Sequence, residues 1–202
     1  MFKTTKALVL REVKYKEADR ILTLLTEDEG KLTAKAQGAL RKTSKFGAAT
    51  QLLTWSELTL FGNRGHWSVR EGTVIEGFEG LRTDLEALAI ASYIAQVLET
   101  VSDEDSPDPQ VLQLGLNSLY ALSRALCEKE QVKAAFELRL MCLAGFEPEL
   151  TRCVACGREQ DGMRFSPVQG GLLCPDCGRY GDPVSPACLA AMRHVTSVNA
   201  KK

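Results

Sequence analysis

Two closely spaced pairs of cysteines near the C-terminus constrain the fold of this chain more than any other feature. Each pair has the form Cys-x-x-Cys and is followed by a glycine; the pairs are Cys153/Cys156 and Cys174/Cys177. Two residues between thiolates let both sulfurs point inward from one tight turn, and the intervening Gly157–Leu173 stretch has a length found in zinc ribbons. Two such turns face to face present four sulfurs in the tetrahedral arrangement that Zn²⁺ accepts. We therefore predict one zinc ion bound by all four cysteines.

The predicted zinc has a structural role. Four sulfur ligands leave no open coordination position for a catalytic water. A zinc deaminase would need a His-x-Glu motif, but His66 is followed by Trp and Ser, and His194 by Val and Thr. The segment Leu150–Asp182 is poor in large apolar residues, so a metal would stabilise what a core cannot. Two disulfides or a thioredoxin-like redox pair are weaker alternatives, because the sequence shows neither an export signal nor a βαβ pattern.

The remaining cysteines and the N-terminal sequence favour a reducing compartment. An odd total of seven cysteines and an N-terminus that carries charge throughout are unlike an exported protein. No run of about 18 apolar residues indicates a membrane span. We therefore expect a cytoplasmic protein without membrane contact. Cys127 and Cys142 lie in helical, apolar surroundings and are expected to be small core residues.

The charge of the chain is distributed unevenly, although its net value is only −1. Residues 1–50 carry eleven basic and six acidic residues, whereas residues 71–113 carry ten acidic residues and one basic residue. Between positions 31 and 46 there is no carboxylate, but there are five cations: Lys31, Lys35, Arg41, Lys42 and Lys45. A segment of this sign predicts a polyanionic partner.

The first eighty residues show five short strand patterns, at 7–13, 20–26, 31–37, 51–61 and 66–75. The third alternates strictly, with Lys31, Thr33 and Lys35 on one face and small or apolar residues on the other, which indicates one buried and one solvated face. Five short strands with hairpin turns predict a small closed β-barrel. The glycine-containing loop at residues 38–49 carries most of the cations and is expected to be mobile.

From Leu81 onward the hydrophobic period becomes helical. Apolar positions from Leu81 to Val101 predict one long helix, and Asp108-Pro109 predicts the capped start of a second helix that ends near Cys127. Further helices are predicted at residues 130–144 and 187–195, the last of them opened by a cap at Ser185-Pro186. The expected fold class is α+β, an N-terminal closed β-barrel (residues 1–79) followed by a helical domain (residues 80–202) with the zinc module at about residues 150–182.

A barrel with a basic face suits single-stranded nucleic acid, because phosphates follow the cations while bases stack on aromatic rings. Arg64 and Arg70 in the last hairpin would add to the five cations above. Phe46 and Trp67 are the candidate stacking rings, with Tyr15 as a further one, whereas Trp55 is expected in the core. The alternative is that these lysines and arginines are ordinary solvated surface residues.

The order of these motifs matches a known family. Residues 5–19 (TKALVLREVKYKEAD) and 22–37 (LTLLTEDEGKLTAKAQ), the basic loop after Gly38, and helices interrupted by a four-cysteine element together resemble the RecO family of bacterial DNA repair proteins. The resemblance covers essentially the whole chain. It implies an OB-fold, a helical domain and a zinc module inserted between helices.

The resemblance also implies a function. It is that of a recombination mediator without catalytic activity, which binds single- and double-stranded DNA and anneals complementary strands. Such a protein contacts the acidic tail of single-stranded DNA-binding protein and, with RecR, helps to load RecA onto coated strands.

An acidic, hydrophobic tail would need a groove with an apolar floor and a basic rim. The candidates for that rim are Arg124, Lys129, Lys133 and Arg139, with ordinary helix-surface charge as the alternative. The main alternative function is a zinc-ribbon RNA-binding or translation accessory factor, which would prefer structured RNA. An enzyme is not expected, because the sequence shows no paired carboxylates, phosphate-binding loop or nucleophile–histidine arrangement.

Overall fold

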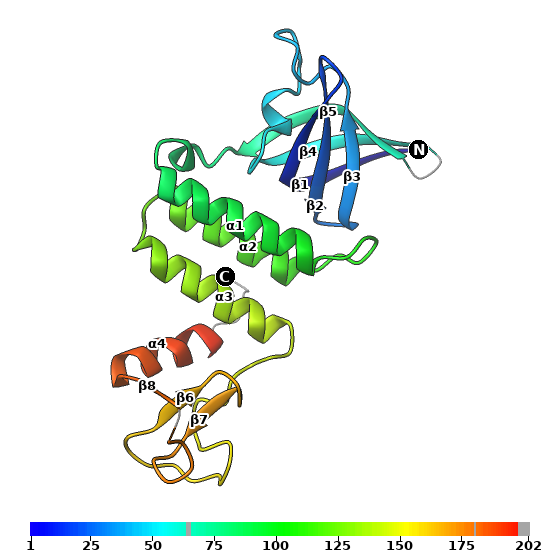
Figure 1. Cartoon of the computed structure of the whole chain (residues 1–202). Helices are drawn as coiled ribbons and strands as arrows, with labels where there is room; N and C mark the ends of the chain where they lie inside the picture. Colours follow the sequence, from blue (N-terminus) through cyan, green and yellow to red (C-terminus); the bar gives the residue numbers. More distant parts are fainter. Residues whose placement is uncertain (64–65, 180, 198–202) are drawn as a thin grey trace. The chain divides into compact units, whose positions relative to one another are not determined.

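Five strands at the N-terminus close into a barrel in the order β1-β2-β3-β5-β4 (Figure 1). They are β1 (Phe2–Tyr15), β2 (Asp19–Thr26), β3 (Gly30–Ala36), β4 (Trp55–Asn63) and β5 (His66–Glu76). All neighbours are antiparallel except β3 and β5, which are parallel. The predicted five-stranded, OB-like barrel is confirmed, and the helices that follow it confirm the α+β class.

The computed structural model describes residues 1–63, 66–179 and 181–197. These residues form two compact units, Met1–Lys133 and Ala134–Lys202, so that the first two long helices group with the barrel.

The barrel core follows from strand alternation. In β3, Leu32, Ala34 and Ala36 are buried, while Lys31 and Lys35 lie on the outer face, as the sequence pattern predicts. Inward side chains of the strands form one buried cluster with further alanines and leucines from the neighbouring loops and strands. Each leucine that is fully buried there stabilises the fold by roughly 1.5–3 kcal/mol.

The long strand β1 closes the barrel by pairing with two neighbours. Residues 2–8 pair with β4, and residues 7–15 pair with β2. The register with β2 shifts between Val9 and Arg11, and at that point Val9 exchanges backbone hydrogen bonds with Leu53 and Thr54 instead. Such an irregularity bends a strand, so one segment can serve both sides of a small barrel.

Helix α1 (Leu85–Val101) begins later than predicted. The Asp84 carboxylate accepts the backbone N–H groups of Glu86 and Ala87, which makes Asp84 the N-cap. Leu81 is therefore outside this helix, in a separate 3₁₀ turn, η2 (Glu79–Arg82), where it is buried.

Helix α2 (Pro109–Ser123) starts as predicted and ends earlier. Asp108 caps it and Pro109 occupies its first turn. The backbone leaves the helix at Ala125, which adopts the left-handed conformation with φ of 49°. Cys127 consequently lies beyond the helix and is exposed, so the expectation of a core position was wrong for Cys127; Cys142 is half-buried.

Helix α3 (Lys129–Leu143) ends before Gly145, which has a positive φ of 86°. After it, three short strands form a sheet in the order β7-β6-β8: β6 (Arg164–Ser166), β7 (Gly171–Leu173) and β8 (Asp182–Pro183). Helix α4 (Pro186–Ser197) follows, and the Ser185 hydroxyl accepts the Cys188 N–H at its start, as the predicted cap requires. Among the helices that the structure describes, none has the length and apolarity to cross a membrane.

Candidate metal centre and nucleic-acid interface

The four cysteines of the two Cys-x-x-Cys pairs meet at one point. Their sulfurs all lie within 4.8 Å of one another, and Cys156 Sγ is 3.7 Å from Cys174 Sγ. With zinc–sulfur bonds of about 2.3 Å, the edge of a tetrahedron is roughly 3.8 Å, so the observed separation fits one ion at the centre. All four are free thiols rather than disulfides. The residues therefore fit a tetrahedral metal site.

Backbone geometry holds each pair in place. Gly157 donates its N–H to the Cys153 carbonyl, and Gly178 donates to the Cys174 carbonyl, both at 2.8 Å. Gly157 needs its positive φ of 73°, which glycine adopts without strain. At Gly178 the reason is space, because a Cβ atom there would lie 2.4 Å from the Leu173 Cβ.

The surroundings of the four sulfurs favour deprotonated thiolates that share one bound cation. The backbone N–H of Cys174, followed by those of residues 155 and 156, lowers the pKa of Cys153 to about 6. Hydrogen bonds with the sulfurs of Cys174 and Cys156 raise the pKa of Cys177 to about 12, so in the absence of a metal this thiol keeps its proton. A divalent cation at the centre would replace that proton and neutralise the gathered negative charge.

A second group of residues gathers at one end of the barrel. The β1–β2 turn and the loop after β3 lie at this end, because Tyr15 pairs with Asp19 and Arg20 pairs with Ala36. A backbone hydrogen bond of 3.0 Å from Leu40 to Ala18 joins the two directly. We call residues 37–49 the basic loop and this part of the molecule the basic end.

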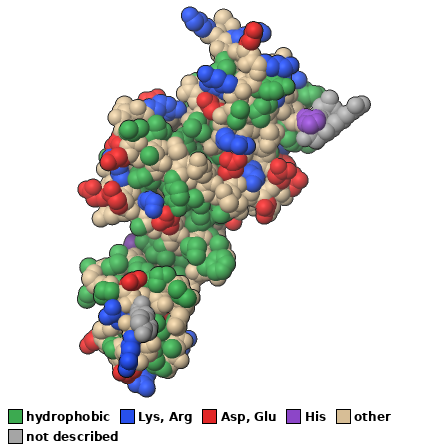
Figure 2. Space-filling model, viewed as in Figure 1, with side chains coloured by type: hydrophobic (Ala, Val, Ile, Leu, Met, Phe, Trp, Pro, Cys, Tyr) green, Lys and Arg blue, Asp and Glu red, His purple; other side chains and the backbone are tan. Residues whose placement is uncertain are grey.

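Three predicted cations are exposed on the basic loop: Arg41, Lys42 and Lys45. Within the described part of the chain, none of them forms an ion pair with a carboxylate. In Figure 2, the charged side chains visible at this end of the barrel are mostly Lys and Arg rather than Asp and Glu. These three residues therefore form a cluster of exposed positive charge on one loop.

The β1–β2 turn adds residues that sequence reasoning did not include among its predicted cations. Lys14 and Lys16 are exposed there, and Lys16 lies 5.5 Å from the centre of the Tyr15 ring, which is itself 44% exposed. Lys35 lies 5.3 Å from the same ring. Two lysines that flank an aromatic residue at a hairpin turn are the sequence signal from which these cations could have been predicted.

Lys31 and Lys35 do not form an open row along β3. The Lys31 ammonium donates to the Glu99 carbonyl at 2.8 Å, at the C-terminal end of α1. The Lys35 ammonium forms an ion pair of 2.9 Å with the carboxylate of Asp19. Both lysines lie on the outer face as predicted, but both are held by groups of the chain itself.

The remaining predicted DNA-binding residues are dispersed. Phe46 and Trp67 are half-buried and pack against the barrel core, so they do not present open stacking faces. Arg70 is exposed and lies 5.1 Å from the Phe61 ring. Arg64 lies outside the described residues.

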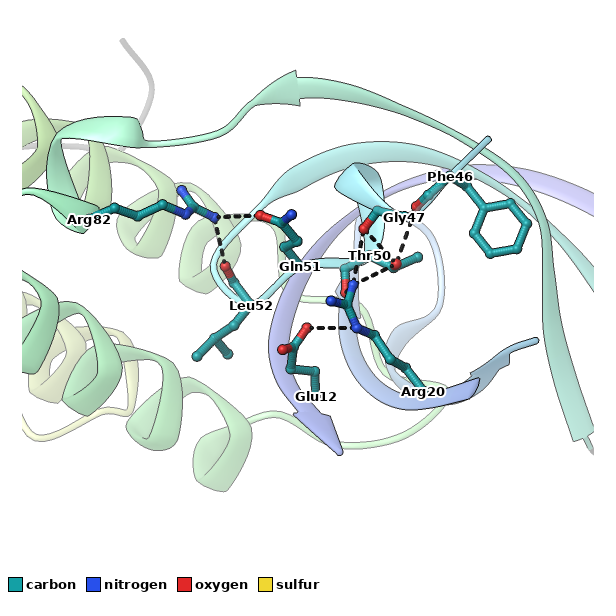
Figure 3. A network of polar contacts seen from close by, with 8 residues as sticks. All are labelled: Glu12, Arg20, Phe46, Gly47, Thr50, Gln51, Leu52 and Arg82. Carbon is teal, nitrogen blue, oxygen red and sulfur yellow. Dashed lines mark hydrogen bonds and ion pairs between the residues drawn. The ribbon is translucent and has the colours of Figure 1, made fainter. Parts of the chain in front are cut away.

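The basic loop was expected to be mobile, but its C-terminal end is anchored (Figure 3). The Arg20 guanidinium donates to the carbonyls of Gly47 and Thr50 and to the Thr50 hydroxyl. On the far side of Thr50, Arg82 donates to the Gln51 side chain at 3.3 Å. These contacts hold the short turn η1 (Ala48–Thr50), where the loop rejoins the barrel.

The predicted rim for a partner tail is not an open basic surface. Lys129 lies 2.8 Å from Asp84 and 2.7 Å from Glu86, and hydrogen bonds to these carboxylates raise its pKa. Arg124 forms a 3.7 Å ion pair with Glu76. Lys133 lies 5.3 Å from the centre of the Tyr93 ring, and Arg139 donates to the Thr196 carbonyl at 2.9 Å.

A pocket of about 430 Å³ lies between the barrel strands and α2. Its apolar lining comes from Trp55, Phe78, Pro109, Leu112, Leu116 and Tyr120. Trp55 is half-buried in this lining rather than part of the barrel core. Lys6, Glu27 and Glu76 also line the cavity, so its charge is mixed.

Comparison with known proteins assigns the family. Models of the N-terminal and C-terminal domains of recombination protein O match residues 1–78 and 82–201. A DNA repair protein RecO of Acetivibrio thermocellus is 40% identical over 174 residues, which are 86% of this chain and 69% of the relative. The RecO of Symbiobacterium thermophilum is 36% identical over 189 residues (92% and 75%), and that of Desulforudis audaxviator is 39% identical over 193 residues (95% and 76%). The chain therefore belongs to the RecO family of DNA repair proteins.

Proposed function

We propose that this protein is a recombination mediator that binds single- and double-stranded DNA through the basic end of its barrel. It anneals complementary strands and, with RecR, helps to load RecA onto strands coated by single-stranded DNA-binding protein, in the cytoplasm and on the nucleoid. Membership of a DNA repair family supports this proposal. The observation that carries it is the group of exposed cations on the basic loop and the adjacent hairpin turn.

The proposed binding is electrostatic and depends little on the base sequence of the DNA. Annealing brings together two phosphate chains that repel each other, and a basic surface offsets this repulsion by releasing counterions. The basic end offers five exposed cations: Lys14, Lys16, Arg41, Lys42 and Lys45. With five phosphate contacts, the logarithm of single-strand affinity should fall with the logarithm of salt concentration with a slope of roughly −3.5.

A double charge reversal tests the proposed site. Arg41→Glu with Lys42→Glu should lower the affinity for single-stranded DNA by about tenfold or more and make the salt slope shallower by about 1.4, since two phosphate contacts are lost. The matched control, Lys6→Glu with Arg124→Glu, makes the same change of charge beside the pocket next to α2 and should have a much smaller effect. Equal losses in both variants, or no loss in the first, would remove the basic end from DNA binding.

The mediator role needs a separate assay. Complementary oligonucleotides coated with single-stranded DNA-binding protein should anneal faster when this protein is added. A translation accessory factor that shares the barrel and the metal site would not accelerate this reaction. It would also prefer structured RNA over DNA of the same sequence in direct competition.

We also propose that one structural Zn²⁺ occupies the four-cysteine site, where it braces the turns that carry its ligands.

The acidic tail of single-stranded DNA-binding protein is a further proposed partner. Among the predicted rim residues, Arg124 is best placed to contact this tail. The Arg124 guanidinium lies 5.5 Å from the centre of the Tyr120 ring, which lines the pocket next to α2.

A further inference from the structure

Two adjacent residues at the start of β2, Asp19 and Arg20, contact opposite ends of the basic loop. Neighbouring side chains on a strand point in opposite directions, so the two can reach separate segments. Asp19 contacts the segment where the loop leaves β3, and Arg20 contacts the segment where the loop rejoins the barrel. Together they bracket the three exposed cations of the loop.

Asp19 fixes the departing segment of the loop. Its carboxylate accepts the Gly38 N–H at 2.8 Å and forms the 2.9 Å ion pair with Lys35. The residue is only 8% exposed. The hydrogen bond from Lys35, followed by that from Gly38, lowers the pKa of Asp19, so the carboxylate is ionised at neutral pH. Gly38 has a positive φ of 73°, which marks the point where the chain turns away from β3.

Arg20 fixes the returning segment (Figure 3). Its guanidinium donates to the Gly47 carbonyl at 3.0 Å and to the carbonyl and hydroxyl of Thr50 at 3.2 Å. Its side chain is only 12% exposed and forms an ion pair of 3.3 Å with Glu12. A guanidinium buried to this extent, with its donors directed at the chain, is not available to a phosphate.

We propose that Asp19 and Arg20 are positioning residues that hold the basic loop in the conformation that grips a phosphodiester chain. This inference rests on the proposed function, to which it adds two residues that touch no DNA. A loop held at both ends loses less conformational freedom when its cations bind phosphates, and such preorganisation raises affinity. The alternative is that both residues act only through their charge.

Two substitutions of Asp19 separate these possibilities, because both remove the same charge. Asparagine retains an oxygen that can accept the Gly38 N–H, whereas alanine does not. If only charge matters, both variants should bind single-stranded DNA more tightly than the unaltered protein, because a carboxylate beside the phosphates is gone. If Asp19 positions the loop, Asp19→Ala should bind about fivefold or more weakly than Asp19→Asn, since the loop must then be ordered on binding.

A protease readout measures the loop itself, without DNA. Trypsin cleaves after Arg41, Lys42 and Lys45, and cleavage requires the chain around the cut site to open locally. Nicking at these positions, located by mass spectrometry, should be several-fold faster in Asp19→Ala than in Asp19→Asn. Arg20→Lys keeps the charge, but one ammonium cannot contact Gly47 and Thr50, which Arg20 reaches through Nη1, and at the same time pair with Glu12, which Arg20 reaches through Nε. This variant should therefore also nick faster. Circular dichroism should show that every variant retains the barrel.

The outcomes decide the question. Faster nicking and weaker binding in Asp19→Ala and Arg20→Lys, with Asp19→Asn close to the unaltered protein, support the positioning role. Equal nicking in all variants, or equally tight binding in Asp19→Ala and Asp19→Asn, overturns it. If the unaltered protein fails to bind DNA, the proposed function fails, while the protease comparison still reports whether the two residues hold the loop.

Discussion

Lys129 illustrates how a surface charge in the sequence becomes a structural contact in the fold. Its ammonium bridges Asp84, the N-cap of α1, and Glu86 in the first turn of the same helix. The hydrogen bond from Lys129 is the main reason that the pKa of Asp84 lies below its ordinary value of 3.8. The contact joins the start of α3 to the start of α1 within the first unit.

The Asp84–Lys129 contact predicts a dependence of stability on pH. A carboxylate whose pKa is lowered by folding stabilises the folded state above its ordinary pKa, and this contribution is lost as pH falls through the folded value. The midpoint of thermal unfolding should therefore decline below about pH 4. The decline should be smaller in Asp84→Asn and in Lys129→Gln, measured by circular dichroism between pH 2 and pH 7. Identical pH curves for all three proteins would mean that the contact does not form in solution.

At the scale of elements, the close approach of α1 and α2 depends on Gly115. This residue is buried in α2, and a Cβ atom there would lie 2.6 Å from a methyl carbon of Leu98 in α1. Leu98 is itself fully buried, so it has little room to move. The absence of a side chain at position 115 lets the two helices pack.

Gly115→Ala sets two effects against each other. Alanine favours an isolated helix over glycine by about 1 kcal/mol, whereas overpacking a filled core costs about 1–3 kcal/mol. We expect packing to dominate, with a net loss of about 1 kcal/mol in the free energy of unfolding. Urea denaturation followed by tryptophan fluorescence reports this, because both tryptophans, Trp55 and Trp67, belong to the first unit. The control Gln113→Ala, on the exposed side of α2, should change the free energy of unfolding by less than about 0.5 kcal/mol. A Gly115→Ala variant that is more stable than the unaltered protein would contradict the packing argument.

The elements were predictable where a local signal sets them. Period-two alternation located β3, and apolar runs bounded by turn residues located the other strands of the barrel. Asp108-Pro109 and Ser185-Pro186 located two helix starts, because caps act within one turn of the chain. Leu81 was misplaced because its apolar spacing continues that of α1, while the cap at Asp84 breaks the helix between them.

The metal site was equally predictable, since both ligands of each pair lie on one turn. The contacts of Lys31 and Lys35 could not be predicted in this way, because the groups that hold these two lysines come from other parts of the chain. Glu99 reaches Lys31 from α1, and Asp19 reaches Lys35 from the neighbouring strand. A one-dimensional charge pattern does not record such contacts, so it overstated the open cationic surface along β3.

At the scale of the whole molecule, the two units differ in what stabilises them. The barrel has an extensive apolar core, whereas the buried cluster around the metal site consists of Cys153, Leu173 and Cys174, with Met163 packed against it. A cluster of this size cannot offset the conformational entropy of the segment around it. The segment that carries the four cysteines should therefore depend on the proposed metal ion for its stability.

Metal removal should consequently act on one part of the protein. A strong chelator should release one zinc ion per chain and make the segment at residues 150–182 sensitive to protease. Tryptophan fluorescence and the affinity for single-stranded DNA should change little, since both report on the first unit. Cys153→Ser should purify without zinc, while Cys188→Ser, at an exposed cysteine outside the site, should retain it. Loss of DNA binding on chelation with an intact barrel would show that the metal module takes part in binding.

The circular closure of the β1-β2-β3-β5-β4 sheet has a consequence for how other proteins can attach to it. Each of these strands has a hydrogen-bonded neighbour on both sides, and only the seam between β3 and β5, which pair at residues 34–35 and 67–68, leaves described strand residues without a neighbour over several positions. Apart from that seam, the described barrel offers little edge on which a guest peptide could extend the sheet. Recognition of a partner by the rest of the barrel then relies on side chains and turns, which can be altered one residue at a time without rebuilding the sheet.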